Sequence, residues 1–279
     1  MSAMIGPSRR WLRAGLAGYT WIVVLFIYLP PVYLLLLSFN PGLLPSVPTL
    51  SNLSLKWYRA LLDEARMLDA LQASVMVAVV TAVVTTVLAL LGGLAYRRMA
   101  ANAQVGFFVF VVFPMFVPGV IQGLALSVIL RVLGVTFSGW TVVAGHLLWS
   151  LPVVFIVLLT SFSVLRGSLA EAAQDLGASE WRVFWDITFP LIRPGIISGA
   201  SFALLLSFNE FIRAFFLVGG QDTLPIYMFG AMNAGTSPTI YSLAGSTLLL
   251  SALGFGLALV GLTLLKTRRG WAHRAVRVS

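Results

Sequence analysis

The sequence predicts an all-α membrane protein with six transmembrane helices. Of its 279 residues, 59% are hydrophobic and only 10% are charged, whereas a soluble domain carries about 25% charged residues. The apolar residues gather in stretches that approach or exceed the roughly 20 residues that a helix needs to cross a bilayer. The basic residues lie beside these stretches, so the net charge of +9 indicates membrane topology rather than nucleic-acid binding.

Six apolar stretches are the expected spans. We place them near residues 19–39, 70–95, 105–133, 140–164, 194–218 and 241–266. The first is long enough to span and lacks a small-residue cleavage site, so we do not expect it to be a removed signal peptide. Pro114 and Pro118 predict a kink in the third span. Two glycine pairs have the spacing that lets helices approach closely, namely Gly119 with Gly123 and Gly195 with Gly199.

The basic residues predict the orientation of the spans. With the N-terminus inside, the cytoplasmic segments hold Arg9, Arg10, Arg13, Arg97, Arg98, Arg166, Arg182, Arg193, Lys266, Arg268, Arg269, Arg274 and Arg277. The outer segments hold Lys56, Arg59 and Arg66. We therefore expect both termini in the cytoplasm. The chain divides into a cytoplasmic segment over 1–18, a transmembrane domain over 19–266 and a basic cytoplasmic tail over 267–279.

One polar loop stands out between the fourth and fifth spans, over residues 165–193. It carries four of the nine acidic residues, Glu171, Asp175, Glu180 and Asp186. Ser168 and Glu171 have capping-box spacing, and Gly177 stands where a glycine ends a short helix. Ser179 can cap a second helix, whose aromatic face consists of Trp181, Phe184 and Trp185. The pattern predicts two short helices with a sharp joint, displayed at the membrane surface.

This loop resembles the EAA loop of bacterial type I ABC importer permeases. The residues that match are Glu171, Ala172, Ala173, Gly177, Ile187 and Pro190. The similarity extends over essentially the full chain and is strongest to permeases of the spermidine/putrescine type. It implies a multi-pass protein of the bacterial inner membrane that moves a small, polyamine-like cation. We call residues 165–193 the coupling loop.

The resemblance also implies partners. In that family the coupling loop docks on an ATPase subunit, and here the contact residues are expected to be Glu171, Ala172, Ala173, Asp175, Gly177 and Ala178. The expected assembly contains ATP-binding subunits, a second homologous permease and an extracytoplasmic substrate-binding protein in membrane lipid. ATP and magnesium are expected on the partner ATPase, with no cofactor in this chain.

The fifth span contains polar residues at membrane depth: Ser207, Asn209, Glu210 and Arg213. Ionisable groups there are costly and usually face a cavity or a partner. Glu210 and Arg213 are three residues apart, so one interpretation is an ion pair on a helix face. The other is that these four residues line the translocation path, where a carboxylate suits a cationic solute.

The first outer loop contains a Trp-Tyr motif that can be interpreted in two ways. After the extended, proline-containing start of the loop 40–69, the sequence from Leu55 to Leu62 is amphipathic. Its Trp57 and Tyr58 are either anchors at the membrane interface or contacts for the binding protein. The second outer loop, 219–240, is rich in turn residues and resembles the re-entrant segment of the family.

No catalytic motif is present in the sequence. It lacks the P-loop pattern, the H-E-x-x-H pattern and the G-x-S-x-G pattern, and it has no cysteine to ligate a metal. We therefore expect a transport subunit and not an enzyme. The alternative is a secondary transporter or channel that works without ATP. Such a protein should show inverted repeats or several intramembrane acids, and the spans hold one, Glu210.

Overall fold

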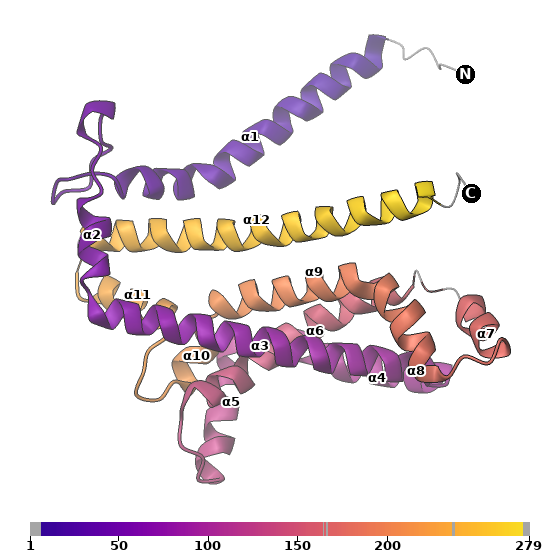
Figure 1. Ribbon diagram of the computed structural model, residues 1–279. Helices are drawn as coiled ribbons and strands as arrows, with labels where there is room; N and C mark the ends of the chain where they lie inside the picture. The colour runs from indigo at the N-terminus through magenta and orange to yellow at the C-terminus, as the bar shows by residue number, and fades with distance from the viewer. Residues whose placement is uncertain (1–6, 164, 166, 236–237, 276–279) are drawn as a thin grey trace. The chain divides into compact units, whose positions relative to one another are not determined.

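The computed structural model describes residues 7–163, 165, 167–235 and 238–275, and every regular element in these ranges is helical (Figure 1). The predicted cytoplasmic residues 1–6 and 276–279, with Arg166 and Arg277, lie outside the described residues. The elements are α1 Pro7–Leu37, η1 Leu50–Asn52, α2 Lys56–Leu62, α3 Ala65–Arg98, α4 Ala101–Val112, η2 Phe113–Phe116, α5 Gly119–Val132, α6 Gly139–Phe162, α7 Gly167–Asp175, α8 Glu180–Val183, the π-helix η3 Phe184–Thr188, α9 Phe189–Phe208, α10 Ile212–Leu217, α11 Leu224–Asn233 and α12 Pro238–Ala275.

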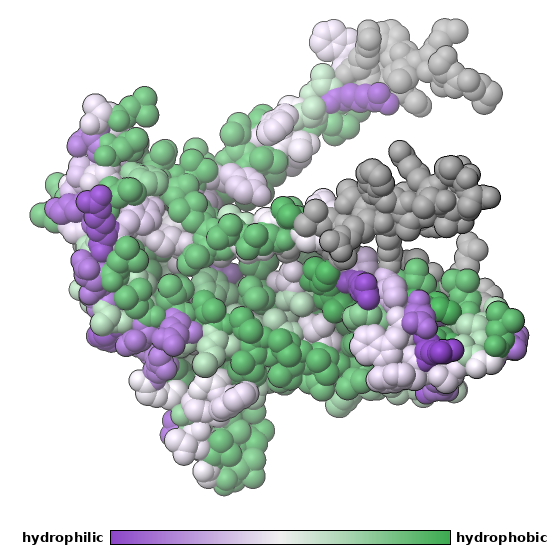
Figure 2. Space-filling view, in the orientation of Figure 1, coloured by the Kyte–Doolittle hydropathy of each residue, from purple (hydrophilic) through white to green (hydrophobic). Residues whose placement is uncertain are grey.

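The chain divides into two compact units, and the larger comprises residues 65–230 and 251–279. Its centre is a bundle of α3, α6 and α9. The buried core of this bundle consists of Ala82, Ala89, Val154, Phe155, Leu158, Phe162, Ile192 and Ala203. Figure 2 shows hydrophobic residues along α3 and hydrophilic residues near its two ends, the pattern expected of a helix that crosses a bilayer.

Glycines allow α6 and α9 to pack closely, as their spacing predicts. A Cβ on Gly199 would lie 2.8 Å from Val154 Cγ1, and a Cβ on Gly195 would overlap the side chain of Ser161. Real side chains do not approach this closely. The two glycines therefore bring the backbone of α9 against α6, which is the packing role of small residues in membrane helices.

A second buried cluster joins α3, α6 and α10 at the end of the bundle away from the coupling loop. It consists of Val77, Val142, Val143, Ala214 and Leu217. The Thr141 hydroxyl on α6 donates a hydrogen bond to the Leu217 carbonyl at 2.7 Å. This bond satisfies a carbonyl at the end of α10, which lacks a partner within the helix.

The smaller unit comprises residues 1–64 and 231–250. Within it, the Tyr58 hydroxyl on α2 lies 2.7 Å from Ser38 Oγ. Ser242 Oγ on α12 donates to the Ser38 carbonyl at 3.1 Å. A Cβ on Gly245 would lie 2.7 Å from the Tyr58 hydroxyl. These contacts fasten α2 between the end of α1 and the start of α12. The amphipathic helix predicted near Leu55 to Leu62 is therefore present.

The described helices agree with most of the predicted spans. Five are long and apolar enough to cross a membrane, and a bent pair gives a sixth candidate. The second and fourth spans match α3 and α6, the first overlaps α1 up to its end at Leu37, and the sixth lies within α12. The third span has the predicted kink at its prolines, as a bend of 101° between α4–η2 and α5.

The fifth span was predicted wrongly. It was expected over 194–218, but its helix starts before Pro194 and ends at Phe208, and α10 follows after a break. The helix that contains the first span already includes residues 7–18, and the outer loop 219–240 contains the helix α11.

The break in the fifth span has a local cause. Asn209 Nδ2 donates to the Leu205 carbonyl at 2.9 Å, and Glu210 Oε1 accepts the Arg213 amide at 3.0 Å. Polar side chains that bond to nearby backbone groups compete with the helix for those groups. The two residues that the sequence singles out for function therefore also end α9 and start α10.

Candidate functional site

The coupling loop folds as two short helices with a sharp joint at Gly177, as predicted. Gly177 has a φ of +88°, a conformation that glycine adopts without a steric penalty. The Gly177 amide donates to the Gln174 carbonyl at 2.8 Å, and the Ala178 amide donates to the Ala173 carbonyl at 2.9 Å. These two bonds form the Schellman motif that commonly ends a helix.

The start of α7 differs from the prediction. The helix begins at Gly167, so Ser168 lies inside its first turn rather than at the cap, and the Ser168 side chain lies outside the described residues. At the second helix, Ser179 caps α8 as predicted, because its side chain accepts a hydrogen bond from the Arg182 amide. The second helix of the loop is therefore anchored by its own cap.

One face of α7 is exposed and acidic. Glu171 and Asp175 are four residues apart, so they lie on the same helix face, and both are exposed. Within the described residues neither forms an ion pair. Leu176, which follows the helix, is 89% exposed. Ala172 is exposed and Ala173 half-buried, so small residues accompany the acids. This is a surface suited to a protein partner, because acids and an apolar residue stand next to each other.

An aromatic cluster joins α8 to α9. The ring centroids of Trp181 and Trp185 are 5.6 Å apart, and Trp185 lies 5.2 Å from Phe184 and 4.9 Å from Phe189. The predicted aromatic face is thus present, with Phe189 added. The π-helix η3 runs through this cluster. It directly precedes Phe189 and Pro190, and Pro190 has no amide to donate. Such π-turns occur often at functional sites.

An ion pair connects the coupling loop to the end of α3. Arg98 Nη2 lies 2.9 Å from Glu180 Oε2, and the two side chains are 75% and 71% exposed. An exposed pair contributes at most about 1 kcal/mol, so it restrains the loop only weakly. A groove of about 570 Å³ adjoins it, lined by Leu94, Ala95, Arg98, Met99, Glu180, Trp181 and Phe184.

Inside the bundle, Arg213 is the centre of a buried polar cluster. Arg213 Nη1 lies 3.1 Å from Glu210 Oε2, with side-chain exposures of 6% and 10%. Arg213 Nε donates to Gln122 Oε1 at 2.7 Å. The guanidinium carbon lies 5.0 Å from the centre of the Trp149 ring. The ion pair predicted between Glu210 and Arg213 is therefore present. We call Arg213, Glu210, Gln122 and Trp149 the Arg213 cluster.

A histidine lies near this cluster. His146 on α6 is buried, and its Nδ1 is 2.7 Å from Ser207 Oγ. Its Nε2 has no hydrogen-bond partner among the described residues. Ser207 is therefore buried and bonded, whereas Asn209 is exposed. Of the four residues predicted to line a path, the structure brings Glu210 and Arg213 into contact and bonds Ser207 to α6.

Sequence reasoning missed Gln122 and Trp149, whereas a lone histidine in a span is expected to pack or hydrogen-bond, as His146 does. Gln122 is an amide within the predicted third span, and polar residues at membrane depth usually have a purpose. That signal was available for Gln122. Trp149 gave no signal, because an aromatic residue in a span is usually part of the packing.

The structure places Trp57 and Tyr58 in different surroundings. Tyr58 turns inward, toward Ser38 and Gly245, and its ring centroid lies 5.4 Å from that of Phe39. Trp57 is half-buried, and Lys56 Nζ lies 4.5 Å from the centre of its ring. The hydroxyl of Tyr58 thus serves the fold of the smaller unit, and a role for either residue in contacting a binding protein remains a prediction.

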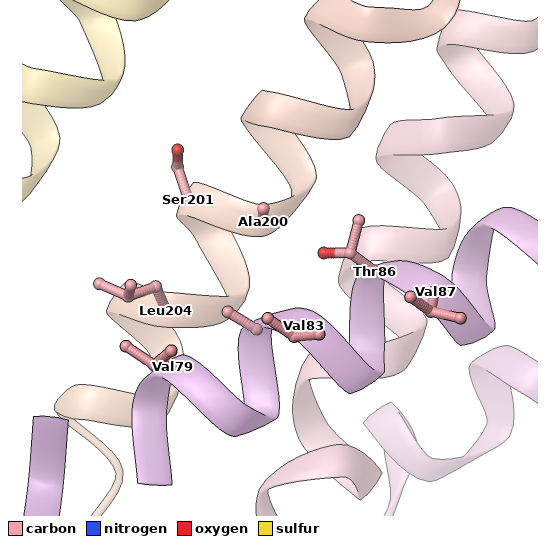
Figure 3. Close-up of a pocket in the computed structure, with 8 residues that line it drawn as sticks. Val79, Val83, Thr86, Val87, Ala200, Ser201 and Leu204 are labelled. Atoms are coloured by element: carbon pink, nitrogen blue, oxygen red, sulfur yellow. The ribbon is translucent and has the colours of Figure 1, made fainter. Parts of the chain in front are cut away.

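An apolar groove of about 440 Å³ lies between α3 and α9 (Figure 3). Its lining residues are Val79, Ala82, Val83, Thr86, Val87, Ala200, Ser201 and Leu204. Ser201 Oγ is occupied by a hydrogen bond to the Ile197 carbonyl at 2.8 Å. Thr86 Oγ1 is buried and has no partner among the described residues. The groove offers mainly aliphatic surface and no charged group.

Comparison with known proteins identifies the family of this chain. Residues 89–265, more than half of the chain, match the family described as binding-protein-dependent transport system inner membrane component. The chain belongs to this family. The match includes the coupling loop, Gln122 and Arg213, so both candidate regions lie within the family's common part.

Two curated relatives illustrate the similarity. The putrescine transport system permease protein PotI of Escherichia coli strain K12 is 33% identical over 86% of this chain and 85% of its own length. The spermidine/putrescine transport system permease protein PotC of the same strain is 30% identical over 84% of this chain and 88% of its own length.

Solved structures share the fold. A bacterial alginate ABC transporter, crystallised with its alginate-bound periplasmic protein, gives a TM-score of 0.66 at 17% identity and covers 92% of this chain and 93% of the other. The MetNI methionine ABC transporter in an inward-facing form gives a TM-score of 0.62 at 14% identity. This match covers 71% of this chain and 95% of the other. These likenesses confirm the predicted permease architecture.

Membership of the family establishes the class of function. The protein is a transmembrane permease subunit of a binding-protein-dependent ABC importer, located in the inner membrane, and it is not an enzyme. Such a subunit works with ATPase subunits and a substrate-binding protein. The ATP-independent transporter or channel, which the sequence alone left open, is excluded by the same finding.

Proposed function

We propose that this permease imports a small, polyamine-like cation and that α7 couples it to an ATPase in the cytoplasm. The observation that supports the substrate class is the similarity to PotI and PotC, which are named for putrescine and spermidine/putrescine transport. At 33% and 30% identity over most of both chains, a shared substrate class is the simplest inference. ATP and magnesium are held by the partner subunit in this proposal.

The exposed end of the coupling loop supports the coupling role. Glu171 and Asp175 stand on α7, and the exposed Leu176 follows it just before the joint at Gly177. The joint leads through α8 and η3 into α9, which packs in the bundle core. Force applied to α7 by a closing ATPase dimer is therefore passed to a transmembrane helix. Glu171, Ala172, Ala173, Asp175, Gly177 and Ala178 are the proposed contact residues.

A second permease subunit is part of the proposal. The stretch Trp11–Leu37 of α1 is long and apolar enough to cross a membrane, and few of its side chains pack within the smaller unit. A helix that is hydrophobic all round needs lipid or another protein against it. We propose that a homologous permease subunit covers α1. We also propose that Trp57 and Tyr58 lie on the side that meets the binding protein.

Uptake of labelled putrescine tests the proposal. The chain is expressed with its ATPase, second permease and binding protein in cells that lack their own polyamine uptake. We expect saturable, ATP-dependent uptake that is lost in Glu171→Ala and in Gly177→Pro, with both variants still present in the membrane. Proline at position 177 removes the amide that bonds Gln174 and cannot adopt a positive φ. Unchanged uptake in both variants contradicts the coupling role.

A further inference from the structure

The Arg213 side chain fills a site that is built like a receptor for a cation. Arg213 belongs to α10, a helix of six residues with non-helical links on both sides, 209–211 and 218–223. Its side chain is almost fully buried in the interior of the larger unit. Three groups from three different elements surround its guanidinium: Glu210 before α10, Gln122 on α5 and Trp149 on α6.

Each of the three groups is suited to positive charge. The Glu210 carboxylate supplies the opposite charge at 3.1 Å. The Gln122 amide oxygen accepts a hydrogen bond at 2.7 Å. The Trp149 ring lies 5.0 Å from the guanidinium carbon, within the roughly 6 Å over which an indole face attracts a cation. Carboxylate, amide oxygen and aromatic face together also suit a primary or secondary ammonium group.

The orientation of Gln122 is fixed by its second partner. Its Nε2 donates to the backbone carbonyls of Pro114 and Val117, two carbonyls at the proline-containing bend. Because the nitrogen is used there, the amide oxygen points to Arg213. The acceptor is therefore held in place by the bend and does not depend on Arg213 to orient it.

Gly119 leaves one wall of the site without a side chain. A Cβ on Gly119 would lie 3.2 Å from both the guanidinium carbon and Nη1 of Arg213. The guanidinium therefore packs against bare backbone there, and its departure would leave space for another group of similar size.

We propose that Glu210, Gln122 and Trp149 form a cation cage, that Arg213 is its tethered occupant, and that an ammonium group of the substrate replaces the guanidinium during transport. This inference rests on the proposed cationic substrate. The exchange keeps one positive charge beside Glu210 at every stage, so the buried carboxylate is never left alone, which would be strongly unfavourable. An unloaded cage is closed by Arg213, and the permease thereby lacks an open cationic path at rest.

Binding of methylguanidinium to an emptied cage tests the inference without relying on transport. The importer complex is purified with Arg213→Ala in this chain, and binding is measured by calorimetry and by the rise in thermal unfolding midpoint. We expect methylguanidinium to bind at least tenfold more tightly to the variant than to wild type. The double variant Arg213→Ala/Glu210→Gln should lose this gain, because it removes the negative charge.

A matched control separates the cage from a general effect of losing an arginine. Arg131 on α5 also lies over an aromatic ring, 4.8 Å from the centre of Phe137, but it is exposed. The Arg131→Ala complex should bind methylguanidinium no better than wild type. Where Arg213→Ala lowers the yield of complex, Arg213→Gln replaces it, since its amide can still bond Glu210, and a smaller gain in the same direction is expected.

The outcomes distinguish this inference from the proposed function. If the Arg213 variants assemble at normal yield and gain no affinity for methylguanidinium, the cage is overturned even where wild type imports putrescine. If wild type imports no putrescine, the proposed substrate class fails, and the methylguanidinium result still decides whether the cage exists. A gain that persists in the double variant with Glu210→Gln also overturns the cage.

Discussion

Among the described residues, an ion pair lies at the coupling end of the permease and another in its interior, and the two pairs differ mainly in burial. Arg98 and Glu180 are separated by 2.9 Å with side chains 75% and 71% exposed, whereas Arg213 and Glu210 are separated by 3.1 Å with side chains 6% and 10% exposed. In the part of the chain that the structure describes, only the interior pair has further partners, an amide oxygen and an indole ring. An arginine–glutamate pair therefore restrains the coupling loop only weakly, whereas a pair of the same residue types holds the interior in a fixed arrangement.

The difference in burial determines how easily each ion pair can break. An exposed pair gains little and is easily broken, which suits a loop that must move with a partner. A buried pair costs several kcal/mol to break, because one charge is left without compensation. The interior can therefore rearrange only if another charge takes the place of the one that leaves. The following changes test this contrast, from the largest expected effect to the smallest.

Glu210→Gln should be the most damaging change. It leaves the Arg213 guanidinium buried without its carboxylate, at a cost of about 3–5 kcal/mol. We expect a large fall in the thermal unfolding midpoint of the purified complex. Glu180→Gln is the matched control, because it neutralises the exposed pair by the same chemical change and should cost at most about 1 kcal/mol. Equal effects would contradict the contrast between the two pairs.

Gly195→Ala should come next, because it disturbs the packed bundle. The added Cβ overlaps the Ser161 side chain on α6, and overpacking of a core typically costs about 1–3 kcal/mol. The control is Gly106→Ala on α4, where a Cβ meets nothing within 4 Å and the change should be neutral or slightly stabilising. Thermal unfolding of the two variants measures the difference, and a neutral Gly195→Ala would show that α6 and α9 are further apart than described.

Gly177→Ala should have a small effect on stability and a larger one on transport. Alanine at a φ of +88° is strained by about 1 kcal/mol. The strain is relieved by reorienting α7, so putrescine uptake should fall severalfold while the amount of protein in the membrane stays constant. Wild-type uptake in this variant would mean that the joint does not set the position of α7.

The Arg98–Glu180 pair should give the smallest effect. A double-mutant cycle with Arg98→Ala and Glu180→Ala is expected to yield a coupling of less than about 1 kcal/mol. Raising the salt concentration should reduce it further, since exposed charges are screened. A coupling energy of about 2 kcal/mol or more would exceed the range of exposed pairs, and it would show that the coupling loop is held firmly against α3.

The coupling loop could be predicted well because its signals are local. The glycine at 177 and the cap at Ser179 depend on hydrogen bonds within a few residues. The aromatic face of Trp181, Phe184 and Trp185 follows from helical spacing alone. Membrane spans were likewise evident from composition and length. These features need no knowledge of what packs against them.

The interior cluster could be predicted only in part, because its partners are distant in sequence. The pairing of Glu210 with Arg213 is local, but Gln122 lies 91 residues from Arg213, and Trp149 is on yet another helix. The break after Phe208 was missed because hydropathy continues through it. The side chains of Asn209 and Glu210 end the helix by bonding to backbone groups, an effect that apolar periodicity does not register.

The central claim is that α7 faces the cytoplasm and is covered by the ATPase, and cysteine labelling tests it most directly. The chain has no cysteine, so Gln174→Cys on the exposed face of α7 introduces a unique thiol. Gly220→Cys, in the exposed link after α10 at the other end of the bundle, is the control. We predict that a membrane-impermeant maleimide labels position 174 only in inverted vesicles, and less when the ATPase is bound, while it labels position 220 from outside. Labelling of position 174 from outside, or labelling that the ATPase does not reduce, would contradict the account.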